Sequence, residues 1–201
     1  MDKQKHTPKL IAIFAITTNN VIGDVKDGQH IMPWPRISQD MKRFKALTDG
    51  HVVVMGRNTW DSLGSYAPLP NRTNIIVSRT LRYTDVMHHP NTYVFDSIDD
   101  AIAYAKEICE TNLPELGRNV YIMGGGQIYR QTKGIVDQIE VTNIIACPNV
   151  GPDTVKFNSF EAYKGFKRTE TSPVYNMTDK STGKKLDFYF YTEVRDTQKL
   201  P

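Results

Sequence analysis

Short apolar runs rich in Val and Ile recur along the chain, and segments with a helical spacing of apolar residues lie between them. Continuous apolar runs of this length are typical of strands buried on both faces, as in parallel sheets, which also need helical crossover connections. The pattern therefore predicts an α/β fold with a mostly parallel sheet. The predicted strands are Leu10–Ile16, Val52–Met55, Asn74–Val77, Tyr93–Phe95, Val120–Met123 and Ile139–Ile145.

The C-terminal part of the chain has a different pattern. Within Lys185–Val194, every second residue from Leu186 to Phe190 is apolar, which is typical of a strand with one solvated face. A polar turn that contains Gly183 separates this segment from Phe166–Thr171, the other strand of the pair. We expect a hairpin that gives the sheet an antiparallel edge.

Capping residues and spacing place a first helix after Ser38, whose side chain is a good N-cap. The apolar residues recur at i, i+4, i+7 and i+11, which puts them on one face of this helix. Asp40 lies four residues before Phe44 and shares much of that face. The apolar face consists of Ile37, Met41, Phe44 and Thr48.

Two further helices follow predicted strands. The second is expected to begin at about Arg57, directly after a strand that ends at Gly56. The third follows Ser97, and Asp100 completes an S-x-x-D capping box. Its buried stripe, at i, i+3, i+4 and i+7, consists of Ile98, Ala101, Ile102 and Ala105.

The composition is that of a globular protein: 201 residues, of which 39% are hydrophobic and 23% charged. This length suits one domain, 1–201, with a core of about 9–195 and short polar tails. No apolar stretch approaches the roughly 20 residues that a membrane helix needs. Because Met1–Leu10 is polar and charged, it does not resemble a signal sequence, and we expect a cytoplasmic monomer.

The cysteines and the charges exclude several classes of site. Cys109 and Cys147 form no C-x-x-C pair, so we expect buried thiols rather than a disulfide. The net charge of +3 is spread along the chain without the clusters of a nucleic-acid surface, and a small polyanionic ligand explains it equally well. His88 and His89 are adjacent and have no zinc-site spacing, so no metal site is expected.

Two features near the first helix carry candidate chemistry. The segment Ile22–Pro35 is a long loop with Gly and Pro that also carries Ile31, Met32 and Trp34, and it is either a lid or an ordinary surface connection. Asp40 is either held for a ligand or is a favourable charge in the first turn of a helix. The residues alone leave both questions open.

Two turns from a strand into a helix are suited to binding anions. At Gly56-Arg57, free backbone N–H groups, a guanidinium and the Thr59 hydroxyl converge, although an isolated Arg often only packs by its stem. At Gly124–Gly126 the backbone can approach a ligand closely, but Tyr129 stands where the dinucleotide fingerprint needs a small residue. Each signal is weak by itself.

Taken in order, these segments resemble the dihydrofolate reductase family from Ile13 to about Val194. The resemblance rests on many short motifs that occur in the family's order. They are Phe14-Ala15, Ile22-Gly23, Met32-Pro33-Trp34, Asp40 with Phe44 and Lys45, Met55-Gly56-Arg57 with Thr59-Trp60, Leu69-Pro70-Asn71-Arg72, Ile76-Val77-Ser78-Arg79, Met123-Gly124-Gly125-Gly126 with Ile128-Tyr129, Val141-Thr142 and Gly151-Pro152-Asp153-Thr154.

The resemblance implies a mixed eight-stranded sheet flanked by about four helices, and an enzyme that reduces 7,8-dihydrofolate and binds antifolates. It implies that Asp40 hydrogen-bonds the amidine edge of the pterin with help from Thr142, and that Arg72 holds the glutamate carboxylate of the substrate. Phe44, Leu63 and Met123 would wall the rings. The implied substrate-binding set is Ala15, Trp34, Asp40, Phe44, Lys45, Leu63, Arg72, Met123 and Thr142.

The same resemblance implies NADPH as the cofactor. Arg57 and Arg79, with Thr59 and Ser78, would bind its 2′-phosphate and the neighbouring phosphate. The glycine turn would carry the pyrophosphate and nicotinamide side, with a cis peptide between Gly124 and Gly125. The implied cofactor-binding set is Ala15, Ile22, Gly23, Gly56, Arg57, Asn58, Thr59, Ser78, Arg79, Gly124, Gly125, Gly126, Gln127, Ile128 and Tyr129.

Four residues are implied to act in catalysis: Asp40 and Thr142 at the pterin, Met32 beside the water that protonates N5, and Tyr129 near the nicotinamide. The chain departs from the family pattern at three places: a loop from Asp24 to Ile31 that is longer than usual, Asn71 in place of a common Gly, and Gln127 in place of a common Arg. The alternatives are a pyrimidine reductase of riboflavin synthesis and a folate- or nucleotide-binding structural component.

Overall fold

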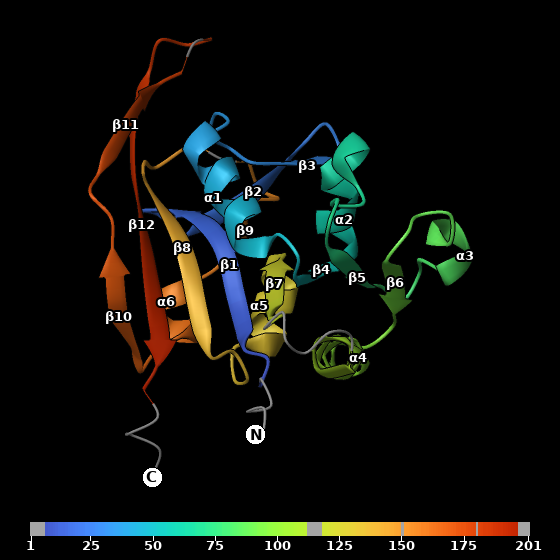
Figure 1. Cartoon of the computed structure of the whole chain (residues 1–201). Helices are drawn as coiled ribbons and strands as arrows, with labels where there is room; N and C mark the ends of the chain where they lie inside the picture. Colours follow the sequence, from blue (N-terminus) through green and yellow to red (C-terminus); the bar gives the residue numbers. More distant parts are fainter. Residues whose placement is uncertain (1–6, 112–117, 150, 180, 197–201) are drawn as a thin grey trace.

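The computed structural model describes residues 7–111, 118–149, 151–179 and 181–196. Its main sheet has the strand order β10-β12-β8-β1-β7-β4-β5-β6, with β11 paired to β12 (Figure 1). All pairs between β8 and β6 along this order are parallel, and the pairs made by β12 are antiparallel. The predicted fold class, a mixed and mostly parallel sheet with an antiparallel edge, is confirmed.

The six predicted apolar strands all form, within one or two residues of the expected bounds. Five of them are mostly buried, as the continuous Val and Ile pattern predicts, and the sixth, Thr92–Phe95 at the end of the strand order, is mostly half-buried. They are β1 Leu10–Thr17, β4 Val52–Gly56, β5 Thr73–Val77, β6 Thr92–Phe95, β7 Val120–Gly124 and β8 Gln138–Ile145.

The C-terminal edge is more divided than the predicted hairpin. β10 Phe166–Thr171 and β12 Lys185–Arg195 pair as expected, but an additional strand, β11 Tyr175–Thr178, lies between them in the chain and also pairs with β12. The tight turn therefore joins β11 to β12. Pro173 lies in the break between β10 and β11, where its missing N–H group would interrupt a strand.

Helices cover both faces of the sheet, four of them with seven residues or more among the described residues. Those four are α1 Ser38–Thr48, α2 Arg57–Leu63, α4 Ile98–Thr111 and α5 Gly126–Thr132. Short turns, α3 Tyr83–Val86, α6 Ser159–Ala162 and the 3₁₀ turn η1 Gly64–Tyr66, complete the set. The predicted starts of α2 and α4 are confirmed, and the Ser97 hydroxyl accepts from the Asp100 amide at 3.1 Å.

The prediction for α1 is wrong in two details. Ser38 is the first helical residue, and the N-cap is Ile37, which makes no side-chain cap bond. Ile37 is instead buried in a small core with Phe188, so packing fixes where this helix starts. Met41, expected on the buried face, is 44% exposed, because the structure leaves part of the apolar face of α1 uncovered.

The predicted long loop after β1 is wrong, since most of it is a small sheet. β2 Val21–Lys26 and β3 Gln29–Ile31 form a hairpin, and β9 Val155–Lys156 pairs with the other side of β2. Asp27 and Gly28 form its two-residue turn, and both have positive φ, 52° and 74°. That is the pairing of residue types and backbone angles typical of a tight hairpin turn.

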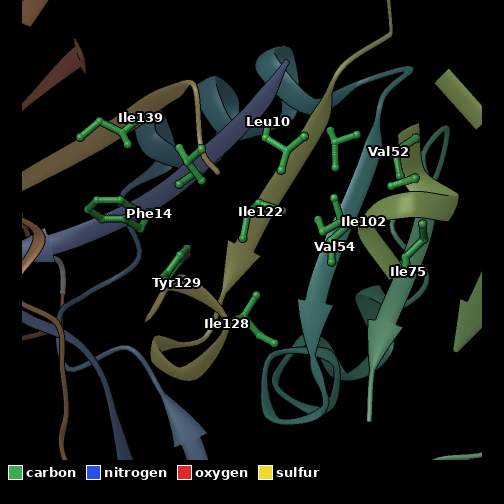
Figure 2. Close-up of a cluster of buried hydrophobic side chains, with 14 of the residues drawn as sticks. Leu10, Phe14, Val52, Val54, Ile75, Ile102, Ile122, Ile128, Tyr129 and Ile139 are labelled. Atoms are coloured by element: carbon green, nitrogen blue, oxygen red, sulfur yellow. The ribbon is translucent and has the colours of Figure 1, made fainter. Parts of the chain in front are cut away.

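Neighbouring residues of the central strands point into two different cores. Val52 and Val54 of β4 face the larger core, against α4 and α5, and Val53 and Met55 face the second core, with Trp60 of α2. Figure 2 shows side chains of several neighbouring strands in the larger core. Burial on both faces fixes the sheet firmly, so its strand ends provide rigid supports for a site.

Three remaining expectations concern the cysteines and membranes. Cys109 is buried and Cys147 is exposed, and both are free thiols. The expected burial of Cys147 is wrong, because it follows the end of β8 instead of lying within the strand. Within the residues that the structure describes, no helix has both the length and the apolar character to cross a membrane.

Candidate active site

The carboxyl ends of β1, β7, β4 and β5 lie together along one edge of the sheet, the edge formed by strand ends and not by an outer strand, because these strands are parallel. The turns that leave this edge include Gly56-Arg57 after β4, Ser78-Arg79 after β5 and Gly125-Gly126 after β7. Open α/β sheets bind ligands at this edge. The three predicted phosphate-binding turns therefore lie in one region of the fold, whereas Arg72 lies before the start of β5.

Asp40 lies in the first turn of α1 and contacts the sheet through β8. The Thr142 hydroxyl donates a hydrogen bond to Asp40 Oδ1 at 2.6 Å. Burial raises the pKa of Asp40 above its usual value, and the Thr142 hydrogen bond and the charge of Arg43 offset only part of that rise. A carboxylate has about four lone-pair positions, and this bond occupies one of them. Asp40 can therefore accept further bonds from N–H donors.

The apolar residues predicted to line the substrate site are only partly covered by the protein. Phe44, Leu63 and Met123 pack against the second core and remain half-exposed. Ala15, which pairs in register with Thr142, and Trp34 pack against the core around Phe188. Met32 is 59% exposed, and Lys45 is also exposed. Partly uncovered apolar side chains on the elements that carry the predicted site suit a flat, partly polar ligand.

Arg72 is a buried cation whose guanidinium is held by the protein. Its Nε donates to the Pro70 carbonyl at 2.9 Å, and its Nη1 donates to the Thr48 hydroxyl at 3.0 Å. Burial lowers the pKa of Arg72, and the charge of Asp49 offsets part of this effect. These bonds fix the plane of the guanidinium, which is the condition for two-pronged recognition of a carboxylate.

In the glycine turn after β7, the Tyr129 ring occupies the space beside Gly124, whereas the space beside Gly125 is nearly open. Gly124 has a φ of +100°, and a Cβ there would lie 2.6 Å from the Tyr129 ring. A Cβ on Gly125 would meet only the Thr59 hydroxyl, at 3.6 Å. The peptide between Gly124 and Gly125 is cis, as predicted. A ligand can therefore approach Gly125 closely, beside the N-terminus of α2.

Tyr129 supports this turn from inside the protein. Its hydroxyl donates to the Ile13 carbonyl at 2.8 Å, and its ring packs against Phe14 and Phe157. Burial raises the pKa of Tyr129 well above its usual value, so it stays neutral. The structure thus ties Tyr129 to β1.

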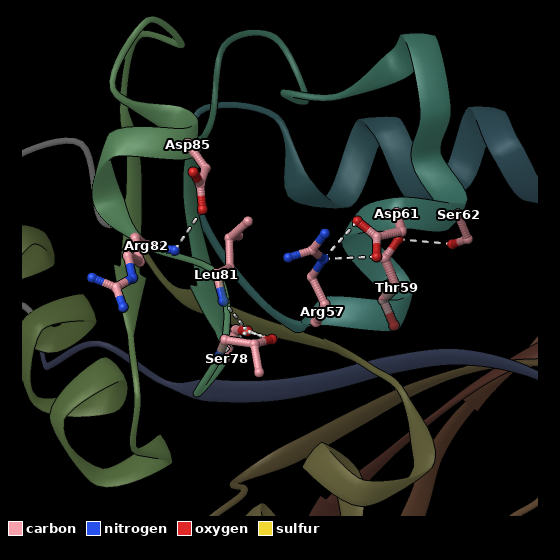
Figure 3. A network of polar contacts seen from close by, with 9 residues as sticks. Arg57, Thr59, Asp61, Ser62, Ser78, Leu81, Arg82 and Asp85 are labelled. Carbon is pink, nitrogen blue, oxygen red and sulfur yellow. Dashed lines mark hydrogen bonds and ion pairs between the residues drawn. The ribbon is translucent and has the colours of Figure 1, made fainter.

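Of the two cations predicted to bind phosphate, Arg79 is exposed and Arg57 is half-exposed. Arg57 Nε pairs with both carboxylate oxygens of Asp61, at 2.8 and 2.7 Å (Figure 3). Ser78 is buried, and its Oγ accepts from the Leu81 amide at 2.9 Å. Arg79, Asn58 and Gln127 are exposed. The turn after β5 is therefore ordered by Ser78, whereas the charged side chains around it face solvent.

The β2-β3 hairpin is fastened next to the glycine turn. A Cβ on Gly126 would lie 3.5 Å from Ile22, which brings the predicted residues Ile22 and Gly23 close to α5. Asp24, a buried acid not predicted as functional, accepts from the Thr154 hydroxyl at 3.0 Å and from the Gly151 amide at 3.4 Å. The Asp27-Gly28 turn signal could have revealed the hairpin from the sequence.

Sequence reasoning also missed an ion pair between α1 and β8. Arg43 Nη2 pairs with Glu140 Oε2, and the Glu140 side chain is 5% exposed. The signal was present: Gln138, Glu140 and Thr142 alternate with apolar residues in β8, which predicts a polar stripe on one face. Among the described residues, no group of three or more His, Cys, Asp or Glu side chains could hold a metal ion.

Comparisons with known proteins give one family for this chain. A family model described as dihydrofolate reductase matches residues 9–195. The chain is 41% identical over 133 residues to a dihydrofolate reductase of Mycobacterium leprae, covering 66% of this chain and 70% of that protein. It is 36% identical over 135 residues to dihydrofolate reductase type 8 of Escherichia coli, covering 67% of this chain and 73% of that protein. It is also 36% identical over 132 residues to a dihydrofolate reductase of Haemophilus influenzae, covering 66% of this chain and 69% of that protein.

Proposed function

The chain belongs to the dihydrofolate reductase family, and on this premise we propose that it reduces 7,8-dihydrofolate to 5,6,7,8-tetrahydrofolate with NADPH, in support of one-carbon metabolism. The observation that carries the proposal is the hydrogen bond between Asp40 of α1 and Thr142 of β8. A half-buried carboxylate with unused acceptor positions matches the N–H donors of a pterin amidine edge. The Thr142 hydroxyl fixes the orientation of the carboxylate.

The rest of the substrate fits the surrounding residues. Phe44, Leu63 and Met123 present half-exposed apolar surface for the rings, and Trp34, Ala15 and Lys45 complete the predicted set. Arg72 binds the glutamate carboxylate of dihydrofolate, because its guanidinium is already oriented by Pro70 and Thr48. Antifolates that carry the same N–H donors would bind at Asp40.

Reduction of the C6–N5 double bond requires a hydride at C6 and a proton at N5. NADPH, when bound, supplies the hydride. A water admitted beside the exposed Met32 delivers the proton, and the negative charge of Asp40 polarises the pterin to favour protonation at N5. Tyr129, held to the Ile13 carbonyl, supports the nicotinamide side of the site.

The residues of the cofactor region fit a dinucleotide phosphate. The open side of Gly125 and the Thr59 hydroxyl suit the pyrophosphate, because backbone N–H groups at a helix start favour anions. Ile22, Gly23, Gly56, Gln127 and Ile128 would complete the nearby contacts. Arg57 and Arg79, with Asn58 and Ser78, would bind the 2′-phosphate, which favours NADPH over NADH. We further propose that the chain forms one domain, 1–201 with a core of about 9–195, and acts as a cytoplasmic monomer.

The decisive experiment follows the absorbance at 340 nm with NADPH and dihydrofolate. We expect steady oxidation that requires both compounds, with NADH a much poorer substitute. The matched control is Asp40→Asn, which keeps the size of the side chain and removes its charge. Oxidation no faster than in the absence of protein would overturn the proposed function.

A further inference from the structure

A buried ion pair joins α1 to β8 next to the contact between Asp40 and Thr142. Arg43 follows Asp40 by three residues, so the two side chains lie on the same side of the helix. Glu140 precedes Thr142 by two residues, so these two share a face of β8. The Arg43–Glu140 pair and the Asp40–Thr142 hydrogen bond therefore connect the same two elements side by side.

Glu140 is held firmly enough to fix Arg43. Besides Arg43, it accepts from Gln138 Nε2 at 2.6 Å and from the Thr192 hydroxyl at 2.9 Å. Thr192 belongs to β12 and pairs in register with Glu140. Arg43 also lies over the Phe190 ring, 5.0 Å from its centroid. The cation is thus held by a carboxylate on β8 and an aromatic ring on β12.

The charges near Asp40 alternate in sign: Asp40 is negative, Arg43 positive and Glu140 negative. The charges of Glu140 and Arg43 also act on Tyr121 of β7. Burial, and to a smaller extent the charge of Glu140, raise the pKa of Tyr121 to about 12, so this side chain is neutral. Glu170 of β10 lines a groove of about 520 Å³ together with Arg43 and Phe190. Arg43 is the cation whose charge lowers the pKa of Asp40 against the effect of burial.

We propose that Arg43 and Glu140 are positioning residues for the Asp40 carboxylate: Arg43 keeps it ionised for the pterin, and Glu140 holds Arg43 in place. The catalytic meaning of this role rests on the proposed function. Arg43 acts on Asp40 through its charge, and Glu140 acts through Arg43, by holding it in place and by neutralising part of that charge. The two residues must therefore affect Asp40 in opposite directions when each is neutralised.

The opposite signs follow from the charge sequence. Arg43→Met keeps the apolar stem against Phe190 and removes the positive charge, so Asp40 becomes easier to protonate and its titration midpoint rises. Glu140→Gln keeps the shape and leaves Arg43 without its partner charge, so the Asp40 midpoint falls. If the pair only supported the fold, the Asp40 midpoint would shift in the same direction in both variants or in neither.

The test measures Asp40 directly, by carboxyl ¹³C NMR titration of protein labelled at Asp and without ligands. Asp40→Asn assigns the resonance, and Glu170→Gln is the matched control, because it removes an exposed acid from the same groove. We expect a higher midpoint for Arg43→Met, a lower one for Glu140→Gln, and no change for Glu170→Gln. Shifts of the same sign in both variants, or none, would overturn the proposal.

Two further variants keep the test decisive if Arg43→Met folds poorly. Arg43→Lys retains the charge but not the planar guanidinium, so its midpoint should stay closer to the wild-type value. Arg43→Met combined with Glu140→Gln leaves no buried unpaired charge, and exchanging a whole ion pair is often tolerated. Its midpoint should lie between those of the two single variants, and a midpoint outside that interval would contradict the proposal.

Ligand binding gives a second readout, with folate as the probe and fluorescence quenching as the signal. At acid pH, Arg43→Met should bind folate on the order of tenfold more weakly than the wild type, with the difference shrinking as the pH rises. If folate binding by Arg43→Met were weakened by the same factor at every pH, the charge mechanism would be contradicted. Wild-type turnover is measured separately: opposite NMR shifts without NADPH oxidation would defeat the proposed function alone, and turnover without those shifts would defeat this inference alone.

Discussion

Asp24 and Asp40 are both poorly exposed aspartates near the same edge of the fold, yet their surroundings differ. Asp24 of β2 receives hydrogen bonds from the Thr154 hydroxyl and the Gly151 amide, both in the turn that leads to β9. Asp40 of α1 receives the Thr142 hydroxyl. Burial acts to raise both pKa values, but the bonds from Thr154, Val25 and Gly151 bring that of Asp24 below its usual value, whereas that of Asp40 stays raised.

This difference separates a carboxylate that the protein satisfies from one with unused acceptor positions, as the proposed ligand-binding role of Asp40 requires. The hydrogen bonds to Asp24 hold the β2-β3 hairpin to the turn before β9, so its charge stabilises the fold. The charge of Asp40 is costly to the free protein, because burial disfavours it and few partners compensate. Such a group is retained when its charge is needed for binding or chemistry.

The largest effect is expected for Asp40→Asn. At neutral pH, kcat/KM should fall on the order of a hundredfold or more, because the variant lacks the negative charge that we propose anchors and polarises the pterin. The loss should be smaller in acid, where a larger fraction of dihydrofolate is protonated at N5 without help from the protein. Initial rates between pH 5 and 8 check this, and equal losses at both ends would show that the assigned role is wrong.

The same variant should be more stable than the wild type at pH 7. The pKa of Asp40 is raised on folding, so its contribution to stability is present below the unfolded value of about 3.9 and is lost as the pH rises through the folded value. The asparagine side chain does not titrate, so the variant does not lose this stability as the pH rises. Thermal melts at pH 7 should therefore favour Asp40→Asn, and the advantage should vanish below about pH 4.

The next effect concerns the glycine turn, where the space beside Gly124 is occupied by the protein and the space beside Gly125 is nearly open, in parallel with the two aspartates. Gly124→Ala should destabilise the fold by about 3 kcal/mol, since Gly124 has a φ of +100° and a Cβ there would lie 2.6 Å from the Tyr129 ring. Gly125→Ala is the matched control, because it meets only Thr59 at 3.6 Å. Urea unfolding measures both, and equal losses would mean that Tyr129 does not fill the space at Gly124.

A smaller effect is expected for Arg72→Lys, which tests a buried cation only partly satisfied by the protein. Lysine cannot reproduce the oriented guanidinium, so the KM for dihydrofolate should rise on the order of tenfold while kcat changes little. Dihydropteroate, which lacks the glutamate, is the control substrate. Its KM should be the same in both proteins, and a parallel rise would show that Arg72 only supports the fold.

The central sheet could be predicted from the sequence because each strand carries its own signal. Val52–Met55 and Val120–Met123 are continuous apolar runs, and burial on both faces requires such runs. The β2-β3 hairpin was missed because glycine and proline punctuation suggested a loop, and the Asp27-Gly28 turn was not recognised as a hairpin signal. β11 was missed because four residues after a proline give little pattern.

The candidate site could be predicted only where a local motif marked it. Gly124 and Arg57 lie at strand-to-helix turns that the sequence displays directly. Arg43 and Glu140 are 97 residues apart, and only tertiary packing shows that they form a pair. The roles of Asp24 and Asp40 likewise depend on Thr154 and Thr142, which are distant in sequence. Partners of this kind are fixed by the fold and not by local spacing.

The smallest effect, and the most direct test of the contrast between the two aspartates, is expected for Asp24→Asn. The pKa of Asp24 is lowered on folding, so its contribution to stability is present above the unfolded value of about 3.9 and is lost as the pH falls through the folded value. At pH 7 the melting temperature of this variant should drop by a few degrees, because an amide accepts fewer bonds from Thr154 and Gly151.

Measured together, the two Asn variants should have opposite signs at pH 7, with Asp24→Asn less stable and Asp40→Asn more stable than the wild type. Below the folded pKa of Asp24, the Asp24→Asn protein should approach wild-type stability, since the native carboxyl is then neutral as well. Because Asp24 contacts the 151–154 turn and not the predicted pterin site, its kcat/KM should change far less than that of Asp40→Asn. If both variants lost stability at pH 7, the charge of Asp40 would be structural, and the distinction between the two aspartates would fail.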